Sequence, residues 1–364
     1  MAADRIAWKP RFLDPRVAST RIRCLNPLSE LQSRGYPVEL FHPQRVSHYA
    51  AVVYSKLYDD ATYHEAKGLQ RRGVRIVLDL CDNHFYNPNG LETLTKAREQ
   101  LRRMMALADE LVASTAAMSE VMRAELSTPR NVTIIEDAVE TEIRGVRTLF
   151  WDRWWEKNQL AKLLRQLKDG NQNGRTPLVW FGIHGGSNAE YGMLDLLKLR
   201  PLLEKLNRHY PLSLTVISNS RVKYVHAIKP WKIPTYYLAW HPNTFFAALR
   251  AHSVAIIPIS QNPFTICKGS HRVGLALQLG LAVVANSIPS YRAFTAACFL
   301  DDWQRGLNSY LANPELRQCH VKLGREIVAR EFILSHIAEK WRRLFDSSMY
   351  YRTAQASLNA SETK

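Results

Sequence analysis

The segment from residue 263 to 294 holds the residues best suited to bind a reactive group. Four of them lie close together: Lys268, Ser270, His271 and Arg272. An apolar run with helical spacing follows and stops at Gly280, so we expect a helix from about Gly269 to Leu279. Free amides and the positive dipole end of a helix favour a bound anion, and the basic side chains and the serine hydroxyl add to this. The pattern predicts a diphosphate site, or else a solvated basic turn that caps an ordinary helix.

A glycine-rich turn follows residues 178–182, which form an apolar run typical of a strand. The turn includes Gly182, Gly185 and Gly186, and glycine lets the backbone approach a ligand closely. A Gly-Gly turn between a strand and a helix is about as common for purely conformational reasons. On its own, this turn is therefore weak evidence for a ligand contact.

Polar side chains also follow the apolar run at residues 74–80. They are Asp79, Asp82, Asn83 and His84. A carboxylate or an imidazole can act as a general base that takes the proton from a hydroxyl. Asp82 and His84 are therefore the candidate catalytic residues. The alternative is that Asp82 and Asn83 only cap a turn before a helix that begins at Leu91.

Short apolar runs separated by helical segments would position these residues. In the first half they are 37–41, 50–54, 74–80, 110–114 and 132–135, and in the second half 178–182, 212–218, 254–259 and 281–285. This βαβ rhythm predicts two α/β domains, each with a parallel sheet. Ligands of such sheets bind outside the carboxyl ends of the strands, so we expect a central cleft between the domains. Arg21 and Arg23, in the first βα loop, either hold a phosphate or acceptor group or face solvent.

Helix boundaries are also marked in the first half of the chain. Asn26 and Pro27 predict the start of a helix that Gly35 ends. Asp59 or Asp60 predicts the start of another, which ends before Gly73.

The 263–294 segment resembles the donor-binding segment of GT-B glycosyltransferases of the bacterial family 1 and family 4 type. It shares the Lys-x-Ser-x-Arg opening, an alanine-containing helix, then Gly-x-x-Val-Val-Ala and a Ser-Ile-Pro-Ser-Tyr loop. Further stretches agree in order: 77–85, 108–122, 180–188, 216–220 and 236–240. The resemblance covers roughly residues 15 to 340. It implies a GT-B fold of two Rossmann-like domains and transfer of a sugar from a nucleoside diphosphate to a hydroxyl.

The resemblance also assigns residues to the donor. It implies that His184, Gly185 and Gly186 line the donor phosphates, and that a second group surrounds the base and ribose. That group is Ser218, Asn219, Tyr237 and Trp240. We expect Trp240 to stack on the base, while the alternative is that Tyr236, Tyr237 and Trp240 are partly buried packing residues.

One departure concerns the glutamate pair that many retaining members carry in this segment. The aligned positions are Cys267 and Leu275. The usual carboxylate hydrogen bonds to the donor sugar and ribose must therefore be replaced or absent. This leaves the donor sugar and the stereochemical outcome open, and it admits an inactive relative.

The predicted organisation has five parts. They are an N-terminal acceptor domain at 1–145, a basic tryptophan-rich linker or helix at 146–176, a donor domain at 177–330, a helix at 331–350 that packs back on the junction, and a disordered tail at 351–364. The reaction is expected to need no metal and no cofactor besides the nucleotide sugar, because basic side chains and helix amides would stabilise the leaving diphosphate.

The net charge of +16 attracts phosphates, anionic lipids or nucleic acid. The junction combines Trp151, Trp154 and Trp155 with arginines and lysines, of which Arg144 and Arg147 are two, and has a leucine stripe. Such a helix can lie on an anionic leaflet, although a leucine stripe more often packs on the protein's own core. Nucleic acid is the rival partner, and a glycosyltransferase that acts on DNA bases would suit both fold and charge.

Several classes are excluded at this stage. Charged residues at positions 4 and 5 interrupt any secretory signal, no apolar run reaches about 18 residues, and the five cysteines form no CxxC pair. We therefore expect a cytoplasmic protein, with peripheral membrane contact as an option. A dinucleotide-dependent oxidoreductase is disfavoured because no GxGxxG follows an early strand. A non-catalytic GT-B-like binding protein and a basic nucleic-acid-binding protein stay open as alternatives.

Overall fold

The computed structural model describes residues 5–143, 145–146, 148–186 and 190–346, and its contacts divide the chain into two compact units. The first unit contains residues up to Ala138, the segment Cys267–Gly269 and the residues from Phe332 onward. The second contains Val139–Ile266 and Ser270–Glu331. The chain therefore leaves the second unit for three residues in the middle of the motif at 263–294.

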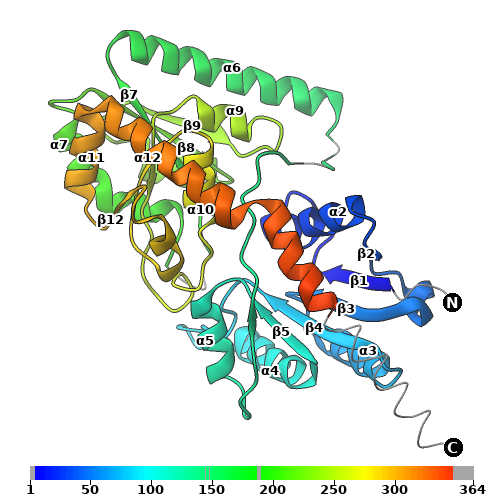
Figure 1. Ribbon diagram of the computed structural model, residues 1–364. Helices are drawn as coiled ribbons and strands as arrows, with labels where there is room; N and C mark the ends of the chain where they lie inside the picture. Colours follow the sequence, from blue (N-terminus) through cyan, green and yellow to red (C-terminus); the bar gives the residue numbers. More distant parts are fainter. Residues whose placement is uncertain (1–4, 144, 147, 187–189, 347–364) are drawn as a thin grey trace, which may run out of the picture. The chain divides into compact units, whose positions relative to one another are not determined.

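The first unit is built on a parallel sheet with the strand order β2-β1-β3-β4-β5-β6 (Figure 1). Its strands are β1 (Arg5–Pro10), β2 (Val38–Leu40), β3 (Tyr49–Ser55), β4 (Arg75–Leu80), β5 (Glu110–Ala113) and β6 (Thr133–Ile134). Every residue of β3 is buried, as expected for a strand that is covered on both faces. β1 is not among the predicted strands, because Lys9 and Pro10 shorten its apolar pattern.

Helices connect these strands. They are α1 (Ala18–Thr20), the π-helical turn η1 (Arg21–Leu25), α2 (Asn26–Ser33), the 3-10 turn η2 (Pro43–His48), α3 (Asp60–Gln70), α4 (Glu92–Leu107) and α5 (Ala116–Ala124). The predicted start of α3 is confirmed, since the Asp59 side chain accepts a hydrogen bond from the Thr62 amide. α2 begins at Asn26, as predicted, but α1 and η1 extend the helical segment back to Ala18.

A C-terminal helix, residues 334–346, completes the core of the first unit (Figure 1). The ring of Trp341 lies 4.7 Å from that of Trp8 in β1, and Phe345 lies 5.8 Å from Trp8. All three side chains are fully buried. The last residues of the described chain therefore help to form the core around the first strand.

The second unit has a parallel sheet with the order β12-β11-β10-β7-β8-β9. Its strands are β7 (Thr176–Phe181), β8 (Leu212–Ser218), β9 (Thr235–Ala239), β10 (Val254–Ile257), β11 (Ala282–Ala285) and β12 (Phe299–Leu300). The helical elements are α6 (Phe150–Gln172), η3 (Met193–Leu199), α7 (Arg200–Leu206), α8 (Arg221–Ala227), α9 (Phe245–Arg250), α10 (His271–Gln278), η4 (Pro289–Phe294), α11 (Trp303–Ala312), α12 (Pro314–Ile327) and η5 (Val328–Phe332).

The observed division differs from the predicted one in three respects. The boundary lies at Ala138 instead of residue 145. The predicted linker or helix at 146–176 is largely the helix α6, and it belongs to the second unit, where it packs on β7, β9 and α9. The C-terminal helix packs on the core of the first unit, and the predicted tail at 351–364 lies outside the described residues, as do Arg144 and Arg147.

Candidate functional site

Each sheet has a point where the strand order reverses. In the second unit the chain runs from β7 to β8 on one side and later returns to β10 on the other. In the first unit, β1 leads to β2 on one side and β3 on the other. Loops diverge at such points and open a crevice at the carboxyl ends of the strands. The candidate residues can be judged by whether they lie there.

The ends of β7 and β8 are tied together by predicted donor residues. The Ser218 hydroxyl donates to the Gly182 carbonyl at 2.8 Å, and the Asn219 side-chain oxygen accepts from the His184 amide at 2.9 Å. The Tyr237 hydroxyl donates to the Ser218 carbonyl at 2.7 Å. These residues are brought together at the carboxyl edge, where they hold the backbone of the glycine-rich turn in place.

Steric constraints within the turn explain one of its glycines. Gly185 has a φ of +96°, and a Cβ there would come within 2.1 Å of the Tyr191 carbonyl oxygen. A Cβ on Gly186 would lie 3.3 Å from the hydroxyl oxygen of Tyr191. Gly185 is therefore required for the turn to fold back on itself, whatever it binds.

Arg272 lies at the start of α10, next to the end of β7. Its Nη2 donates to the Phe181 carbonyl at 2.5 Å, and its guanidinium lies 5.4 Å from the rings of Trp180 and Phe181. A Cβ on Gly182 would lie 3.5 Å from the guanidinium carbon, so this glycine leaves space beside the charge. Burial lowers the pKa of Arg272, and only the longer-range effects of Tyr291 and Asp195 oppose this.

Among the described residues at this edge, Nε of Arg272 and Nδ1 of His184 are buried and have no hydrogen-bond partner. Arg272 forms no ion pair with a carboxylate of the described residues. Buried polar atoms in native proteins nearly always have a partner, so an orphaned pair at a sheet's reversal point calls for an explanation. An acceptor-rich anion would provide it.

The remaining predicted donor residues have mixed environments. α10 begins at His271, two residues later than expected, and its N-cap Ser270 makes no side-chain capping hydrogen bond. His271 Nε2 lies 3.9 Å from Glu140. The half-buried Trp240 packs 6.1 Å from Phe245, which agrees with the packing alternative as well as with a ligand contact.

Asp195 is a polar residue that sequence reasoning missed. It is 5% exposed, accepts from the Gly192 amide at 3.0 Å, and accepts from the hydroxyl of Ser260 after β10. Lys198 donates to Ser260 at 2.7 Å. This network joins the loops after β7 and β10, the two that diverge at the reversal point. A lone carboxylate within the apolar run Met193–Leu199 was the signal that could have revealed it.

Lys268 belongs to the first unit, where its ammonium forms an ion pair with Asp82. Lys56, after β3, pairs with the other carboxylate oxygen. Burial opposes the ionisation of Asp82, but the two ammonium groups outweigh it and hold the pKa well below its usual range. A carboxylate in this state is a weak proton acceptor, so Asp82 is the poorer of the two predicted bases.

His84 is neutral at pH 7. Burial lowers its pKa to about 4, and the charges of Lys56, Lys268 and Arg11 add to this, while Asp82 opposes it. Its Nδ1 lies 2.7 Å from the Tyr58 hydroxyl. If Nδ1 carries the proton and donates to Tyr58, Nε2 has a free lone pair, which is the tautomer that a general base needs.

A small cavity of about 70 Å³ lies at the reversal point of the first sheet. Its lining includes Arg11 and Lys56, which follow β1 and β3, as well as His84. The helical segment that leads into α2 contributes Ser19, Thr20 and Arg23. Arg11 and Lys56 were not singled out from the sequence, although both directly follow strands. The cavity suits a small polar group with negative charge.

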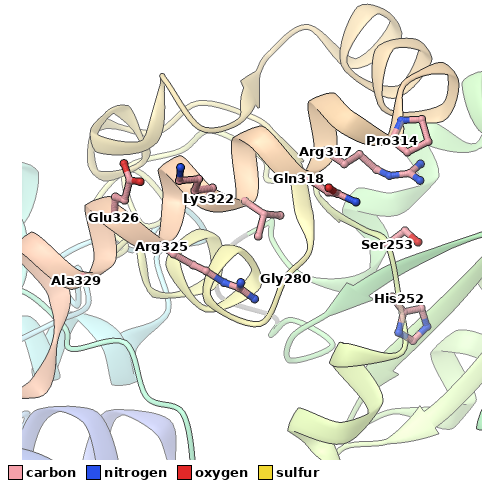
Figure 2. A pocket seen from close by; sticks show the side chains of 11 residues that line it. His252, Ser253, Gly280, Pro314, Arg317, Gln318, Lys322, Arg325, Glu326 and Ala329 are labelled. Atoms are coloured by element: carbon pink, nitrogen blue, oxygen red, sulfur yellow. The ribbon is translucent and has the colours of Figure 1, made fainter.

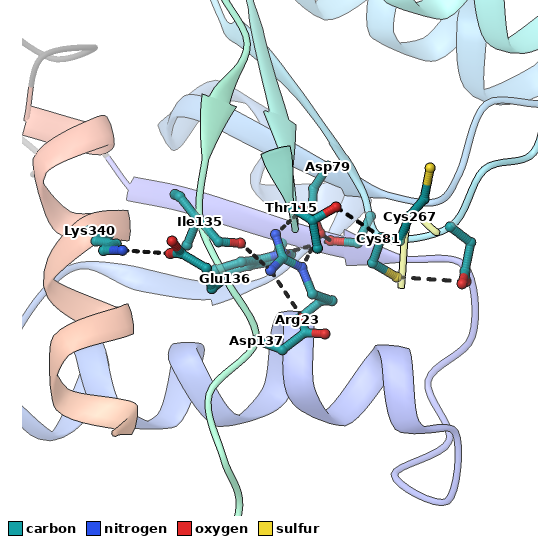
Figure 3. A network of polar contacts seen from close by, with 12 residues as sticks. Arg23, Asp79, Cys81, Thr115, Ile135, Glu136, Asp137, Cys267 and Lys340 are labelled. Atoms are coloured by element: carbon teal, nitrogen blue, oxygen red, sulfur yellow. Dashed lines mark hydrogen bonds and ion pairs between the residues drawn. The ribbon is translucent and has the colours of Figure 1, made fainter. Parts of the chain in front are cut away.

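Arg21 and Arg23 do not face solvent, and Arg23 is not available to a phosphate. Both are about 97% buried, with 3% and 2% exposed. Arg23 pairs with Asp79 and with Asp137 and donates to the Ile135 carbonyl at 2.5 Å (Figure 3). Arg21 donates to the Pro15 carbonyl at 2.7 Å. Asp79 likewise points into this network, so its position after an apolar run did not indicate an active-site role.

Cys267 and Leu275 occupy the aligned glutamate positions. They are 0% and 1% exposed, and burial raises the pKa of the Cys267 thiol to about 11. Both side chains are part of the interior. Any hydrogen bonds to sugar hydroxyls must therefore come from other residues.

An open cavity of about 740 Å³ in the second unit lies at the opposite edge of its sheet (Figure 2). Ser253 and Gly280, which line it, precede β10 and β11. Arg317, Lys322 and Arg325 of α12 give it a basic character. Because it lies at the amino ends of the strands, it is separate from the candidate donor site.

Among the described residues no helix is long and apolar enough to cross a membrane, and no cluster of three His, Cys, Asp or Glu side chains could hold a metal ion.

No protein-family model and no curated protein matches the sequence. Several solved structures match this chain. S. aureus TarM, in complex with UDP and α-GlcNAc-glycerol, is 12% identical with a TM-score of 0.56 over 81% of this chain and 55% of that one. The α,α-trehalose-phosphate synthase (UDP-forming) of Burkholderia vietnamiensis is 13% identical with a TM-score of 0.57 over 92% and 76%. That of Burkholderia xenovorans, in complex with glucose-6-phosphate, is 14% identical with a TM-score of 0.53 over 80% and 72%.

The chain spans just over half the length of the TarM chain it matches. Sequence identities of 12% to 14% show a similarity of fold alone. Both matched groups are GT-B glycosyltransferases with two α/β units, as here. The chain therefore has the GT-B fold, with one Rossmann-like domain in each of its two units.

Proposed function

We propose that this protein is a glycosyltransferase that moves a sugar from a nucleoside diphosphate to a hydroxyl acceptor without a metal ion. The observation that carries the proposal is the pair of orphaned nitrogens on Arg272 and His184 at the carboxyl end of β7. A diphosphate offers several acceptor oxygens and a negative charge, both of which this edge lacks. The fold and the motif at 263–294 support the same ligand.

In this proposal the donor diphosphate lies against the glycine-rich turn and the start of α10. Arg272 and the amides at His271 would stabilise the charge that develops on the leaving phosphate. Ser218 and Asn219 position the turn, Ser270 offers a hydroxyl, and Trp240 stacks on the base. Lys268 would reach the same diphosphate only by exchanging its present partner, Asp82.

The acceptor would bind in the first unit, at the cavity lined by Arg11, Lys56 and His84. The bond between the sugar carbon and the diphosphate oxygen breaks as the acceptor oxygen bonds to that carbon. His84 Nε2 takes the acceptor's proton, and Tyr58 positions the ring. The basic lining favours an acceptor that carries a negative group.

The pH profile tests the base. Because the pKa of His84 is lowered to about 4, its neutral form persists down to that pH, and kcat/KM should fall only as the pH drops through about 4. His84→Gln should lower kcat by about 10²-fold and remove this acidic limb. The measurement is kcat/KM from pH 3.5 to 8, in roughly half-unit steps, for both proteins. A fall in kcat/KM of the parent protein near pH 6.5, or full activity of His84→Gln, would argue against His84 as the base.

Thermal unfolding in the presence of UDP, GDP, CDP, dTDP or ADP tests the donor site. A nucleotide at 100 times its Kd should stabilise the protein by about 2.7 kcal/mol, because only the folded state binds it. Arg272→Met should abolish the shift, and Lys268→Ala should reduce it. The matched control is Arg305→Met, an exposed arginine of the same unit. Shifts with none of the nucleotides would overturn the proposal.

A second candidate is a GT-B-like protein that binds sugars or nucleotides without catalysis. The burial of Cys267 and Leu275 in place of the glutamate pair favours it. Turnover of the nucleotide sugar distinguishes the glycosyltransferase from this non-catalytic candidate. A stabilising nucleotide whose sugar derivative is neither transferred nor hydrolysed would support this candidate.

A further inference from the structure

The N-terminal end of α6 exposes a cluster of large apolar side chains. Phe150, Trp151 and Trp154 are 72%, 75% and 60% exposed, and Leu149 before them is 73% exposed. Trp155 is 45% exposed. Single exposed hydrophobic residues are normal on protein surfaces, but five within seven residues form a continuous patch, and such patches mark interaction sites. We call Leu149, Phe150, Trp151, Trp154 and Trp155 the aromatic end of α6.

The opposite side of the helix is firmly held by the second unit. Leu163 and Leu167 are buried, and the buried carboxylate of Glu156 accepts from Asn243 at 2.9 Å and lies 3.2 Å from His241. This carboxylate lies in the second turn of the helix, next to Trp155. Leu163 and Leu167 of the leucine stripe therefore pack on the core, as one alternative predicted, whereas Leu164 is 38% exposed and the tryptophans lie outside the core.

The outer face continues from aromatic to basic. Residues eleven apart lie about three turns along the same face of a helix. Lys162 and Arg165 therefore lie in line with Trp151 and Trp154, and all four are exposed. Across the whole helix the exposed side chains include five basic residues and two acidic ones. The basic residues are Arg153, Lys157, Lys162, Arg165 and Lys168, and the acidic ones are Asp152 and Asp169.

We propose that the outer face of α6 binds an anionic lipid leaflet, with the helix lying in the plane of the surface. Tryptophan and phenylalanine insert favourably at the level of the headgroups, and lysine and arginine are attracted to anionic lipids. A helix of 23 residues is about 34 Å long, at about 1.5 Å per residue, so the aromatic and basic parts can engage one surface together. The net charge of +16 adds a long-range attraction of the same sign.

Charge complementarity favours lipid over a second copy of this chain. A second copy would present the same basic face, and like charges would repel. A nucleic acid would suit the lysines and arginines, but single-stranded bases stack on aromatics only where a basic groove tracks the backbone. A single helix presents a rod-shaped surface and not a groove, and Lys162 and Arg165 lie about three turns away from Trp151 and Trp154.

The test is sedimentation with sucrose-loaded vesicles of equal parts phosphatidylcholine and phosphatidylglycerol, using the full chain. The expected result is binding to these vesicles and much weaker binding to phosphatidylcholine alone. Trp151→Ser/Trp154→Ser should lower the vesicle partition coefficient by at least about tenfold, and Lys162→Glu/Arg165→Glu by about tenfold or more. The matched controls are Val222→Ser, an exposed valine of the same unit, and Lys205→Glu/Arg208→Glu, two exposed basic residues near α7.

Thermal unfolding shows whether the variants are folded. The replaced side chains are exposed, so all four proteins should unfold within about 2 °C of the parent. Equal binding of parent and α6 variants to anionic vesicles overturns the proposal, and so does an absence of vesicle binding by the parent. A parent that forms dimers or binds single-stranded oligonucleotides through the aromatic end, without binding vesicles, overturns it as well. The nucleotide-shift experiment is independent of this outcome, because it tests Arg272 and Lys268, which none of the vesicle variants replaces.

Discussion

Arg272→Met is expected to lower kcat/KM for sugar transfer by about 10²- to 10³-fold while changing the free energy of unfolding by no more than about 1 kcal/mol. The large kinetic effect follows from the proposed role, since Arg272 would face the charge that develops on the leaving diphosphate. The small effect on stability follows from its surroundings. Among the described residues the guanidinium has no carboxylate partner, and the variant loses its hydrogen bond to the Phe181 carbonyl and its contacts with the rings of Trp180 and Phe181.

This separation of activity from stability distinguishes a binding arginine from a structural one. The contrasting variant is Arg23→Met, which leaves the buried Asp79 and the partly buried Asp137 without their cation. It should destabilise the protein strongly, whereas Arg272→Met should not. The measurements are steady-state transfer kinetics with the nucleotide sugar selected by the thermal-shift panel, and denaturant unfolding of each variant. If Arg272→Met unfolds as easily as Arg23→Met, or keeps full activity, its role is structural.

Asp79→Ala is expected to destabilise the fold by about 3–5 kcal/mol. Asp79 is fully buried and accepts from two nitrogens of Arg23 and, at 3.0 Å, from the Ser55 hydroxyl. Ser55 in turn accepts from the indole of Trp8 at 3.0 Å. Removing the carboxylate leaves an arginine with a buried charge and breaks the chain of hydrogen bonds that joins β1, β3 and β4.

Denaturant unfolding followed by circular dichroism measures this effect. The control is Asp14→Ala, which removes an exposed pair with Arg16 and should change the free energy of unfolding by less than about 1 kcal/mol. The double variant Arg23→Met/Asp79→Leu should recover much of the loss, because it removes both charges. Equal midpoints for Asp79→Ala and Asp14→Ala would show that the buried pair contributes little.

Local sequence patterns were enough to predict the fold class. Apolar runs of four to seven residues separated by helical segments predicted nine of the twelve strands of the described residues, for example β3 and β8. The Asp59 cap and the glycine after α10 fixed helix ends by local hydrogen bonding and by a φ of +95° at Gly280. Strand β1 was not predicted because its apolar pattern is short, although β1 lies at the point where the strand order of the first sheet reverses.

The candidate donor site was predicted in part. The motif located Arg272, and the residues after strands located Ser218, Asn219 and His184, because parallel strands end at a common edge. The sequence did not indicate Asp195 or Lys56, whose partners are supplied by other loops. The tie between the loops after β7 and β10 exists only once the sheet has formed.

The sequence by itself determined the alternation of most strands with helices, the motif at the start of α10 and the basic charge of the chain. The tertiary structure alone decided which charges are free to act. Arg23 and Arg272 are the same residue type near predicted strands, yet one is neutralised by two aspartates from distant positions and the other keeps an orphaned nitrogen. Lys268 likewise pairs with a carboxylate 186 positions away. The physical reason is that burial and ion pairing depend on long-range neighbours, which local patterns do not specify.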